Sequence, residues 1–360
     1  MKTQGAGSRN QESKKLPPAI FLMGPTACGK TGVAVELAQT LPVEIISVDS
    51  ALVYRDMNIG TAKPDAATLA KAPHHLIDIL DPTEAYSAAA FRRDALRLMK
   101  NITQRGKIPL LVGGTMLYFK ALREGLNELP ESNPVVRAAL NAEIAQHGIR
   151  HLHLQLAQVD AKTAMRLHPT DTQRIQRAME IYRLTGQPMS ALIRSVPSPA
   201  GGRGLGRGSS PDETSSSLHL PLPQPLSHLR ERGADSLPYR IIPIALIPGD
   251  RAQLHVRIAT RFKTMLELGL VDELHMLRKK YSLHARMTAM RCVGYRQAWQ
   301  FMEGEIDDVQ LLETGTAATR QLAKRQLTWL RAMPGNIELD CLTPDLAQKA
   351  ISVLSQLLIT

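Results

Sequence analysis

Gly24-Pro25-Thr26-Ala27-Cys28-Gly29-Lys30-Thr31 fits the phosphate-loop pattern G-x-x-x-x-G-K-[ST] at every fixed position. The apolar residues 19–23 before it predict a short buried strand, and residues 31–40 after it predict a helix. Where a strand turns into a helix, backbone N–H groups can point at a phosphate chain, and the helix dipole favours its charge. We expect Lys30 to reach the phosphates and the Thr31 hydroxyl to bind Mg²⁺. The pattern predicts a di- or triphosphate ligand and leaves open which one.

The length and composition of the chain favour some classes of protein and exclude others. The 360 residues suffice for about two domains. The net charge of +11, from 44 Lys and Arg against 33 Asp and Glu, indicates an acidic partner such as nucleic acid, although many soluble proteins are mildly basic. Aromatic residues make up only 4%, which argues against a base-stacking surface for single strands. No apolar run approaches the roughly 20 residues of a membrane span, so no membrane partner is expected.

The N-terminus and the cysteines predict the location. Residues 1–16 are mostly polar, which predicts a disordered lead-in rather than a secretory signal. Cys28, Cys292 and Cys341 have no metal-ligand spacing, and Cys28 lies inside the phosphate loop, which argues against a structural disulfide. A reducing cytoplasm fits these features best, and nothing requires more than a monomer.

Two more turns are expected beside the phosphate loop. Residues 43–48 predict a strand that ends at Asp49, and residues 108–112 predict one that runs into Gly113-Gly114-Thr115. Ligands of open parallel sheets lie beyond the carboxyl ends of the strands. Asp49 is therefore the best candidate for a catalytic carboxylate, with a helix cap or an indirect role at Mg²⁺ as the alternative. Thr115 is expected to donate to a phosphate, contact the substrate or cap the next helix.

The predicted fold is α/β, a phosphate-loop parallel sheet with an all-helical insertion domain. Residues 17–126 form the first part of the core, and 127–196 show only helical patterns. Residues 197–238 are rich in Gly, Ser and Pro and lack the apolar content of a core, so we interpret them as a flexible insert. Residues 239–360 complete the core and end in helices.

Several predicted helices carry polar or basic faces. On helix 172–185, capped by Asp171, Gln173 and Arg177 share a face for which ordinary solvation is the simpler interpretation. In the helix after Asp250, Arg257 and Arg261 lie four residues apart, a spacing that can clamp a pyrophosphate. The helix near 316–332 has a basic stripe beside its buried one, as a binder of phosphate backbones would. The stripe consists of Arg320, Lys324 and Arg331, with Arg325 close by.

These parts suit two reactions. In a small-molecule kinase, the loop holds ATP and Asp49 takes a proton from a hydroxyl. In alkyl transfer from a pyrophosphate ester, the loop holds the leaving group and Asp49 takes a proton from an attacking amine. A motor or switch NTPase is disfavoured, because the strand 108–112 ends in Gly-Gly instead of a Mg²⁺-binding Asp.

Six motifs in order carry a resemblance to a known family. They are Gly-Pro-Thr-Ala-Cys-Gly-Lys-Thr (24–31), Val-Asp-Ser-Ala-Leu-Val-Tyr (48–54), Asn-Ile-Gly-Thr-Ala-Lys-Pro (58–64), Val-Gly-Gly-Thr-Met-Leu-Tyr (112–118), Arg-Cys-Val-Gly-Tyr-Arg-Gln (291–297) and Gln-Leu-Ala-Lys-Arg-Gln-Leu-Thr-Trp-Leu-Arg (321–331). Together they closely resemble the bacterial tRNA dimethylallyltransferases, over nearly the whole chain outside the first fifteen residues and 197–238.

The resemblance implies an activity and its residues. A dimethylallyl group would pass from dimethylallyl diphosphate, with Mg²⁺, to N6 of the adenosine 3′-adjacent to the anticodon of tRNAs that read U-starting codons. The implied catalytic residues are Asp49 as general base, Lys30 and Thr115. The implied diphosphate site is the loop 24–31 with one of Arg257 and Arg261. The residues implied to contact the anticodon stem-loop are Asp49, Ser50, Ala51, Leu52, Thr115, Arg137, Gln173, Arg174, Ile175, Gln176, Arg177, Arg291, Cys292, Val293, Gly294, Tyr295, Arg296, Lys324, Arg325, Gln326, Leu327, Thr328, Trp329, Leu330 and Arg331.

Two features depart from the family pattern. The family members considered lack an insert like 197–238, which we predict to be disordered and dispensable. Cys28 occupies a loop position that is often Ser or Ala in the family, and its oxidation is expected to block the site.

Overall fold

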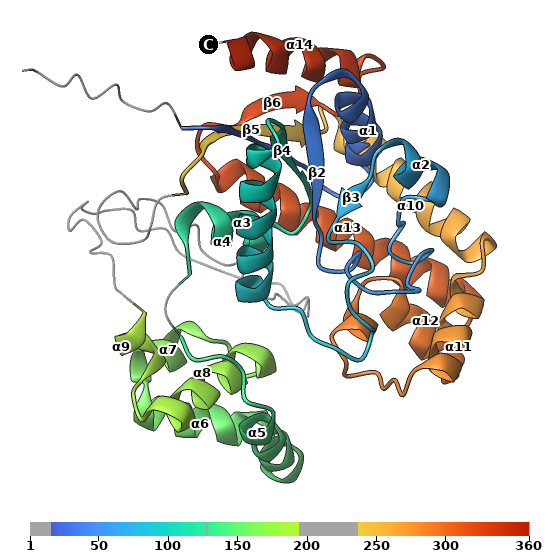
Figure 1. Ribbon diagram of the computed structural model, residues 1–360. Coiled ribbons are helices and arrows are strands. Elements are labelled where there is room, and N and C mark those ends of the chain that lie inside the picture. Colours follow the sequence, from blue (N-terminus) through green and yellow to red (C-terminus); the bar gives the residue numbers. More distant parts are fainter. Residues whose placement is uncertain (1–15, 127–128, 194–236, 360) are drawn as a thin grey trace, which may run out of the picture. The chain divides into compact units, whose positions relative to one another are not determined.

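The computed structural model describes residues 16–126, 129–193 and 237–359 (Figure 1). Contacts divide the chain into two compact units, Met1–Gly125 with Ala234–Thr360, and Leu126–Gly233. We call them the core unit and the helical unit. The segments 1–16 and 197–238, predicted to be disordered or flexible, lie outside the described residues except at positions 16, 237 and 238.

The described part of the core unit is built on a six-stranded sheet with the order β3-β2-β4-β1-β5-β6. The strands are β1 (Pro18–Met23), β2 (Val43–Val48), β3 (His74–His75), β4 (Ile108–Gly113), β5 (Arg240–Ile247) and β6 (Ile337–Asp340). Every neighbouring pair is parallel. The predicted α/β class with a parallel sheet is therefore confirmed.

The strand β1 lies in the middle of this sheet. Phe21 is opposite Leu111 of β4 on one side and Pro243 of β5 on the other. The side chains of residues 19–23 are at most 1% exposed. Parallel sheets are covered by helices on both faces, which is why this strand is a continuous apolar run in the sequence. The phosphate loop thus leaves the sheet at its centre.

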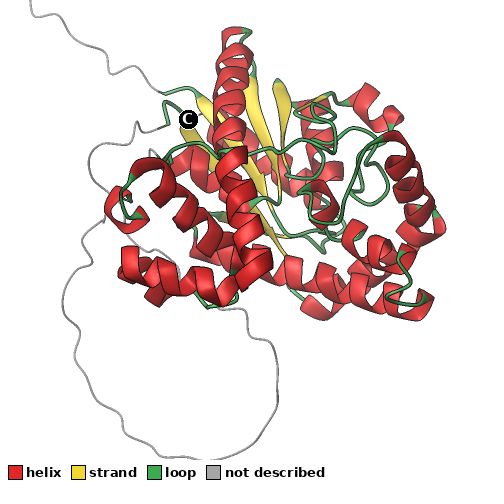
Figure 2. Ribbon diagram, turned by 90° about the horizontal axis from the view of Figure 1, so that it is seen from below, coloured by secondary structure: helices red, strands yellow, loops and turns green. Residues whose placement is uncertain are grey.

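Helices cover both faces of the sheet (Figure 2). Alternate residues of β1 face opposite sides, so Phe21 belongs to one apolar cluster and Leu22 to the other. The helices of the Phe21 cluster are α3 (Ala88–Gln104), α4 (Met116–Glu124), α10 (Arg251–Glu267) and α13 (Asp308–Ala332). The helices of the Leu22 cluster are α1 (Lys30–Thr40) and α14 (Leu346–Ile359).

A third apolar cluster of the core unit supports the segment after β2. Val53, Tyr54 and Met57 are at most 1% exposed and pack with residues of three short elements. These elements are α11 (Leu270–Lys280), the 3₁₀ helix η1 (Ala289–Arg291) and α12 (Tyr295–Met302). The cluster fixes the chain that follows Asp49.

The described part of the helical unit consists of helices around its own core. They are α5 (Pro134–His147), α6 (Ile149–Val159), α7 (Ala161–Arg166), α8 (Thr172–Thr185) and α9 (Met189–Leu192). Leu140, Leu152, Leu156 and Ile175 are completely buried in its core. As predicted, Asp171 caps α8, because its carboxylate accepts a hydrogen bond from the N–H of Arg174.

Several predicted boundaries differ from the structure. The helix α2 (Ala66–Lys71) and the two-residue strand β3 have no counterpart in the prediction. The strand β6 has no counterpart in the prediction. The helix α13 begins at Asp308 rather than near 316, because Asp307 and Gln310 form a capping box there. On α10 the buried residues are Leu254, Ile258 and Phe262.

Candidate active site

The phosphate loop joins the end of β1 to the start of α1, as predicted. Gly29 has a φ of 83°, a conformation that glycine adopts at little cost. Gly24 has no room for a side chain, because a Cβ there would lie 2.6 Å from the Cys28 sulfur. Both glycines are therefore required by the backbone path of the loop.

Lys30 is folded back onto its own loop. Its Nζ donates to the carbonyl oxygens of Gly24 at 3.0 Å and Pro25 at 2.7 Å. An anionic phosphate would compete with these oxygens for the Lys30 ammonium group. It would bind the ammonium more strongly, because a hydrogen bond between two charged groups is stronger than one to a neutral carbonyl. The Lys30 ammonium group is thus held against the backbone of the phosphate loop.

The turns after β2 and β4 are joined to each other. Asp49 accepts hydrogen bonds through Oδ1 from the N–H of Ala51 at 2.8 Å and of Leu52 at 3.3 Å. The Thr115 hydroxyl accepts from the N–H of Ser50 at 3.1 Å. Gly113 allows this approach, because a Cβ there would lie 2.0 Å from the Val48 carbonyl oxygen. Both expected roles of Asp49 remain open, since one oxygen holds the turn and the other makes no hydrogen bond within the described chain.

A glutamine on α13 connects the phosphate loop to the second turn. The Gln326 side-chain oxygen accepts from the N–H of Thr26 at 2.9 Å, and its nitrogen donates to the Gly114 carbonyl oxygen at 2.9 Å. Gln326 is only 9% exposed. The sequence placed this residue among RNA contacts, whereas the structure places its amide within the site framework.

The two arginines of α10 have different surroundings. Arg257 is exposed and donates to the Cys341 carbonyl oxygen at 3.1 Å. Arg261 is half-buried and makes no hydrogen bond or ion pair with any residue that the structure describes. Burial lowers the pKa of Arg261, while the nearby Asp49 and Cys28 raise it. Arg261 is therefore the member of the pair whose charge lies close to the predicted base and the loop.

Two cysteines near the site have shifted acidity. Cys28 is completely buried, which by itself raises its pKa, but a hydrogen bond with Cys341 and the charge of Lys30 bring the pKa down to about 6. Burial and the neighbouring Asp49 raise the pKa of Cys292 to about 12. Cys28 thus sits in a positive environment, and Cys292 lies beside the predicted base.

The exposed face of α13 gathers positive charge. Arg320, Lys324, Arg325 and Arg331 are exposed, and none forms an ion pair with another described residue. Burial and the nearby charge of Arg296 lower the pKa of Arg325, so two guanidinium groups lie close together. Such a pair favours an anion, as expected for a surface that binds phosphates.

Other residues predicted to contact RNA have buried side chains. Tyr295 is 0% exposed and donates its hydroxyl hydrogen to Glu273. Ile175, Leu327 and Leu330 are at most 6% exposed. These side chains pack in apolar cores, and their implied contacts with RNA stay predictions.

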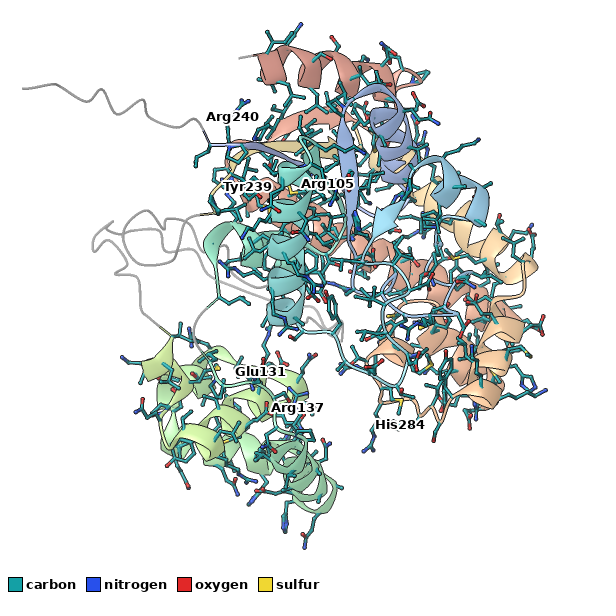
Figure 3. The ribbon with its side chains drawn as sticks, in the orientation of Figure 1. Arg105, Glu131, Arg137, Tyr239, Arg240 and His284 are labelled. Carbon is teal, nitrogen blue, oxygen red and sulfur yellow. The ribbon has the colours of Figure 1, made fainter. Side chains whose placement is uncertain are left out.

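In the helical unit, the predicted arginines are tied to a buried carboxylate. Glu180, 0% exposed, accepts from Arg137 at 3.1 Å and from Arg177 at 2.7 Å (Figure 3 labels Arg137). These bonds lower the pKa of Glu180, although burial opposes the shift. Arg174 pairs with Asp171 at 3.2 Å. The face predicted from the sequence is thus held by internal ion pairs.

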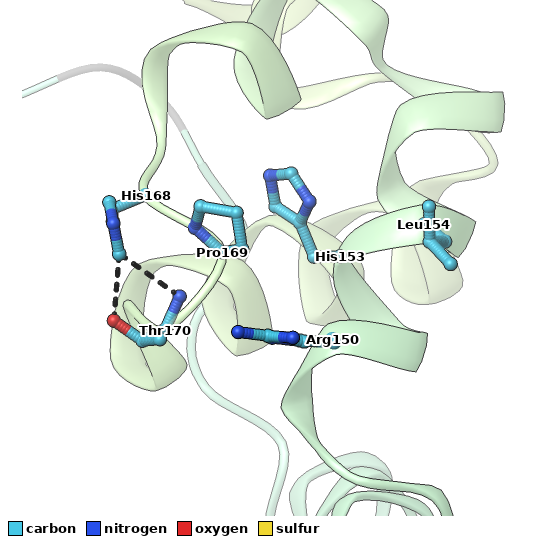
Figure 4. A pocket seen from close by; sticks show the side chains of 6 residues that line it. All are labelled: Arg150, His153, Leu154, His168, Pro169 and Thr170. Carbon is cyan, nitrogen blue, oxygen red and sulfur yellow. Dashed lines mark hydrogen bonds between the residues drawn. The ribbon is translucent and has the colours of Figure 1, made fainter.

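A cavity of about 320 Å³ lies in the helical unit (Figure 4). It is lined by Arg150, His153, Leu154, His168, Pro169 and Thr170. The His168 ring bonds within the cavity wall, through Nδ1 to the Thr170 hydroxyl at 2.8 Å.

Comparison with known proteins gives the family. The family model described as IPP transferase matches residues 52–207 and 217–333. A tRNA dimethylallyltransferase of Methylobacillus flagellatus is 55% identical over 340 residues, which cover 93% of this chain and 96% of the relative. The chain belongs to the IPP transferase family.

Other members of the IPP transferase family agree in sequence and in fold. The tRNA dimethylallyltransferase of Thiobacillus denitrificans is 53% identical, with 94% of this chain and 97% of the relative covered. The crystal structure of the tRNA isopentenylpyrophosphate transferase of Bacillus halodurans matches with a TM-score of 0.61 and 31% identity over 95% of each chain. A eukaryotic dimethylallyltransferase acting on tRNA matches with a TM-score of 0.71 but 22% identity, over 95% of this chain and 79% of the other, which supports the fold alone.

Sequence reasoning missed one anchor of the site in this IPP transferase. The carboxylate of Glu273 accepts from the N–H groups of Asn58, Ile59 and Gly60. Gly60 is needed there, because a Cβ would lie 2.5 Å from the Tyr295 ring. Glu273 lies in none of the six motifs, so no signal in the sequence pointed to it. In the described ranges, every helix is too short or too polar to span a membrane.

Proposed function

We propose that this chain transfers a dimethylallyl group from dimethylallyl diphosphate to N6 of the adenosine 3′-adjacent to the anticodon, in tRNAs that read U-starting codons. The observation that carries the proposal is the meeting of three features at the carboxyl edge of the sheet in a member of the IPP transferase family. They are the phosphate loop, the carboxylate oxygen of Asp49 that bonds to no described residue, and Arg261, which has no partner among the described residues.

The reaction needs a place for the charge that grows on the leaving group. As the carbon–oxygen bond of the ester breaks, its electron pair moves to the diphosphate. Lys30, the N–H groups of the loop and Arg261 would stabilise this charge. Lys30 would exchange its bonds to the Gly24 and Pro25 carbonyl oxygens for bonds to the diphosphate, and Arg261 has no bond to a described residue to give up.

The acceptor nitrogen must lose a proton as it attacks. The N6 amine forms a bond to the first carbon of the dimethylallyl group, and the free oxygen of Asp49 takes its proton. The other oxygen stays bonded to the N–H groups of Ala51 and Leu52, which fixes the orientation of the carboxylate. An adenine within a folded loop must first leave its stack, at a cost of a few kcal/mol.

Mg²⁺ fits the residues of the loop. The Thr31 hydroxyl stands exposed in the first turn of α1 and makes no hydrogen bond to the described residues. Mg²⁺ prefers oxygen ligands and commonly combines one or two protein groups with phosphate oxygens and waters. Bound at Thr31, it would neutralise part of the charge on the diphosphate.

RNA would bind the basic face of α13, whose cations form no ion pair with another described residue. Lys324, Arg325 and the neighbouring Arg296 are the residues we assign to the phosphate backbone. Gln173, Gln176 and the arginines around Glu180 are the proposed contacts of the helical unit.

One incubation tests the proposal. The protein is mixed with Mg²⁺, labelled dimethylallyl diphosphate and an anticodon stem-loop with three consecutive adenosines. We expect label to move into the RNA, and Asp49→Ala to abolish the transfer. A small-molecule kinase is the alternative that the phosphate loop alone allows. Consumption of the γ-phosphate of ATP without prenyl transfer would reject our proposal in its favour.

A further inference from the structure

Gln326 occupies an unusual position for a residue of a basic helix. Its neighbours Lys324 and Arg325 are exposed, but its own side chain is 9% exposed and points into the core unit. Both ends of its amide are used, one by the Thr26 N–H and the other by the Gly114 carbonyl oxygen, each at 2.9 Å. Each end of its side-chain amide is therefore bonded to the core unit, and its burial leaves little of the amide exposed to an external ligand.

The two partners of Gln326 belong to the two halves of the site. Thr26 lies in the phosphate loop. Gly114 precedes Thr115, whose hydroxyl holds the N–H of Ser50 next to Asp49. A single side chain thus links the loop that would bind the leaving group to the turns that carry the base.

The chemistry of the link requires glutamine. One planar group must accept a hydrogen bond from the Thr26 N–H and donate one to the Gly114 carbonyl oxygen. A carboxylate has no hydrogen to donate, and a methionine side chain has neither an N–H group nor a carbonyl oxygen. The helix behind it is firmly seated, because Ala323, Leu327 and Leu330 are at most 6% exposed in the core. The Gln326 amide also lies close to the backbone of Gly114, since a Cβ on Gly114 would lie 2.3 Å from the Gln326 nitrogen.

We propose that Gln326 is a positioning residue for the phosphate loop, and that it holds the loop at a fixed separation from the turns of Thr115 and Asp49. The inference deepens the proposed function and rests on it for the identity of the substrate. It differs from an RNA contact, because the bonds of Gln326 would set the affinity for diphosphate and leave the affinity for RNA unchanged.

The test is a calorimetric titration with inorganic diphosphate and Mg²⁺, beside a separate titration with the anticodon stem-loop. Gln326→Met keeps the volume and removes both hydrogen bonds. We expect it to weaken diphosphate binding about tenfold, which corresponds to about 1.4 kcal/mol, and to leave stem-loop affinity within about twofold. The matched control is Gln321→Met, an exposed glutamine on the same helix, which should change neither affinity.

Steady-state kinetics provide a second test of the proposal. In Gln326→Met the KM for dimethylallyl diphosphate should rise and the KM for the stem-loop should not. If Gln326→Met fails to fold, Gly114→Ala displaces the same amide from the other side and should raise the same KM. Unchanged diphosphate binding, or equal losses for both ligands, would overturn the assignment.

The two proposals fail in different ways. Inorganic diphosphate is not consumed, so its titration depends on the loop and not on prenyl transfer. A wild-type protein that binds diphosphate but transfers no prenyl group would reject the proposed function, while a selective loss in Gln326→Met would still support the positioning role.

Discussion

Asp49 divides its two carboxylate oxygens between two tasks. Oδ1 holds the turn after β2, and the other oxygen makes no hydrogen bond to any described residue. Asp49→Asn keeps an oxygen that can accept from the turn, but it removes the base. We expect transfer to fall about 10²- to 10⁴-fold with the melting temperature nearly unchanged, measured by single-turnover kinetics and thermal unfolding. Asp49→Ala should lose stability as well, and near-normal transfer by Asp49→Asn would exclude this residue as the base.

The contact between Tyr295 and Glu273 belongs to the framework of the core unit. Three backbone N–H groups and the Tyr295 hydroxyl converge on one carboxylate. Tyr295→Phe should cost about 1 kcal/mol of unfolding free energy and Glu273→Gln about 1–3 kcal/mol, measured by urea unfolding. RNA affinity per folded molecule should stay the same. A drop in RNA affinity without loss of stability would restore Tyr295 as an RNA contact.

At the scale of elements, α10 presents two arginines that are not equivalent. Arg261 is half-buried near Asp49 and Cys28, while Arg257 is bonded to the backbone at Cys341. We expect Arg261→Met to raise the KM for dimethylallyl diphosphate at least tenfold, because a partly buried charge beside the leaving group is weakly screened. Arg257→Met, the matched control on the same helix, should raise it less. The reverse order in steady-state kinetics would contradict the assignment.

The junction of β2 and α3 predicts a pH dependence of stability. Glu44 of β2 accepts a hydrogen bond from Arg105 near the end of α3 (Figure 3 labels Arg105), which is the main reason that its pKa falls from 4.5 to about 2. A carboxyl group with a depressed pKa contributes stability above its unfolded pKa and loses it as the pH falls through the folded one. The difference in stability between wild type and Glu44→Gln should therefore shrink between about pH 4.5 and 2.

Urea unfolding at several pH values measures that difference. Glu36→Gln, at an exposed position of α1, serves as the control and should follow the wild type. A difference that stays constant over this range would show that the Arg105 contact does not stabilise the charged form.

The local parts of this fold could be predicted from the sequence. The phosphate loop, the strands β1 and β2 and the cap Asp171 follow from neighbouring residues, and the structure has them close to the expected positions. The strands β3 and β6 have two and four residues, too few for a periodic pattern, and they form only because a neighbouring strand offers an edge.

The non-local parts of the site could not be predicted in the same way. Gln326 and Thr26 are 300 positions apart, and Glu273 and Gly60 are 213 positions apart. A helical pattern separates a buried stripe from an exposed one, but it does not say which buried polar group meets which backbone atom. The family resemblance named Gln326 and Tyr295 but not Glu273, and the structure shows that the Gln326 amide and the Tyr295 hydroxyl bond to other parts of the core unit.

For the whole molecule, the net charge of +11 predicts how RNA binding responds to salt. Each phosphate neutralised by Lys or Arg releases counterions, so affinity should fall steeply with ionic strength. Lys324→Ala should weaken stem-loop binding and reduce the slope of log K against log salt by roughly one, without an effect on diphosphate binding. Fluorescence anisotropy at several salt concentrations measures the slope. An unchanged slope would remove Lys324 from the RNA-binding surface.

The order of the strands also matters while the ribosome is still making the chain. β1 needs β4 on one side and β5 on the other, yet β5 begins only at Arg240, after the entire helical unit. Domains generally fold as units during synthesis, and unpaired strand edges promote aggregation. For the time that the helical unit takes to be translated, the nascent chain carries a half-built sheet whose central strand has one open edge. Slow translation or truncation within this interval should therefore make the protein dependent on chaperones.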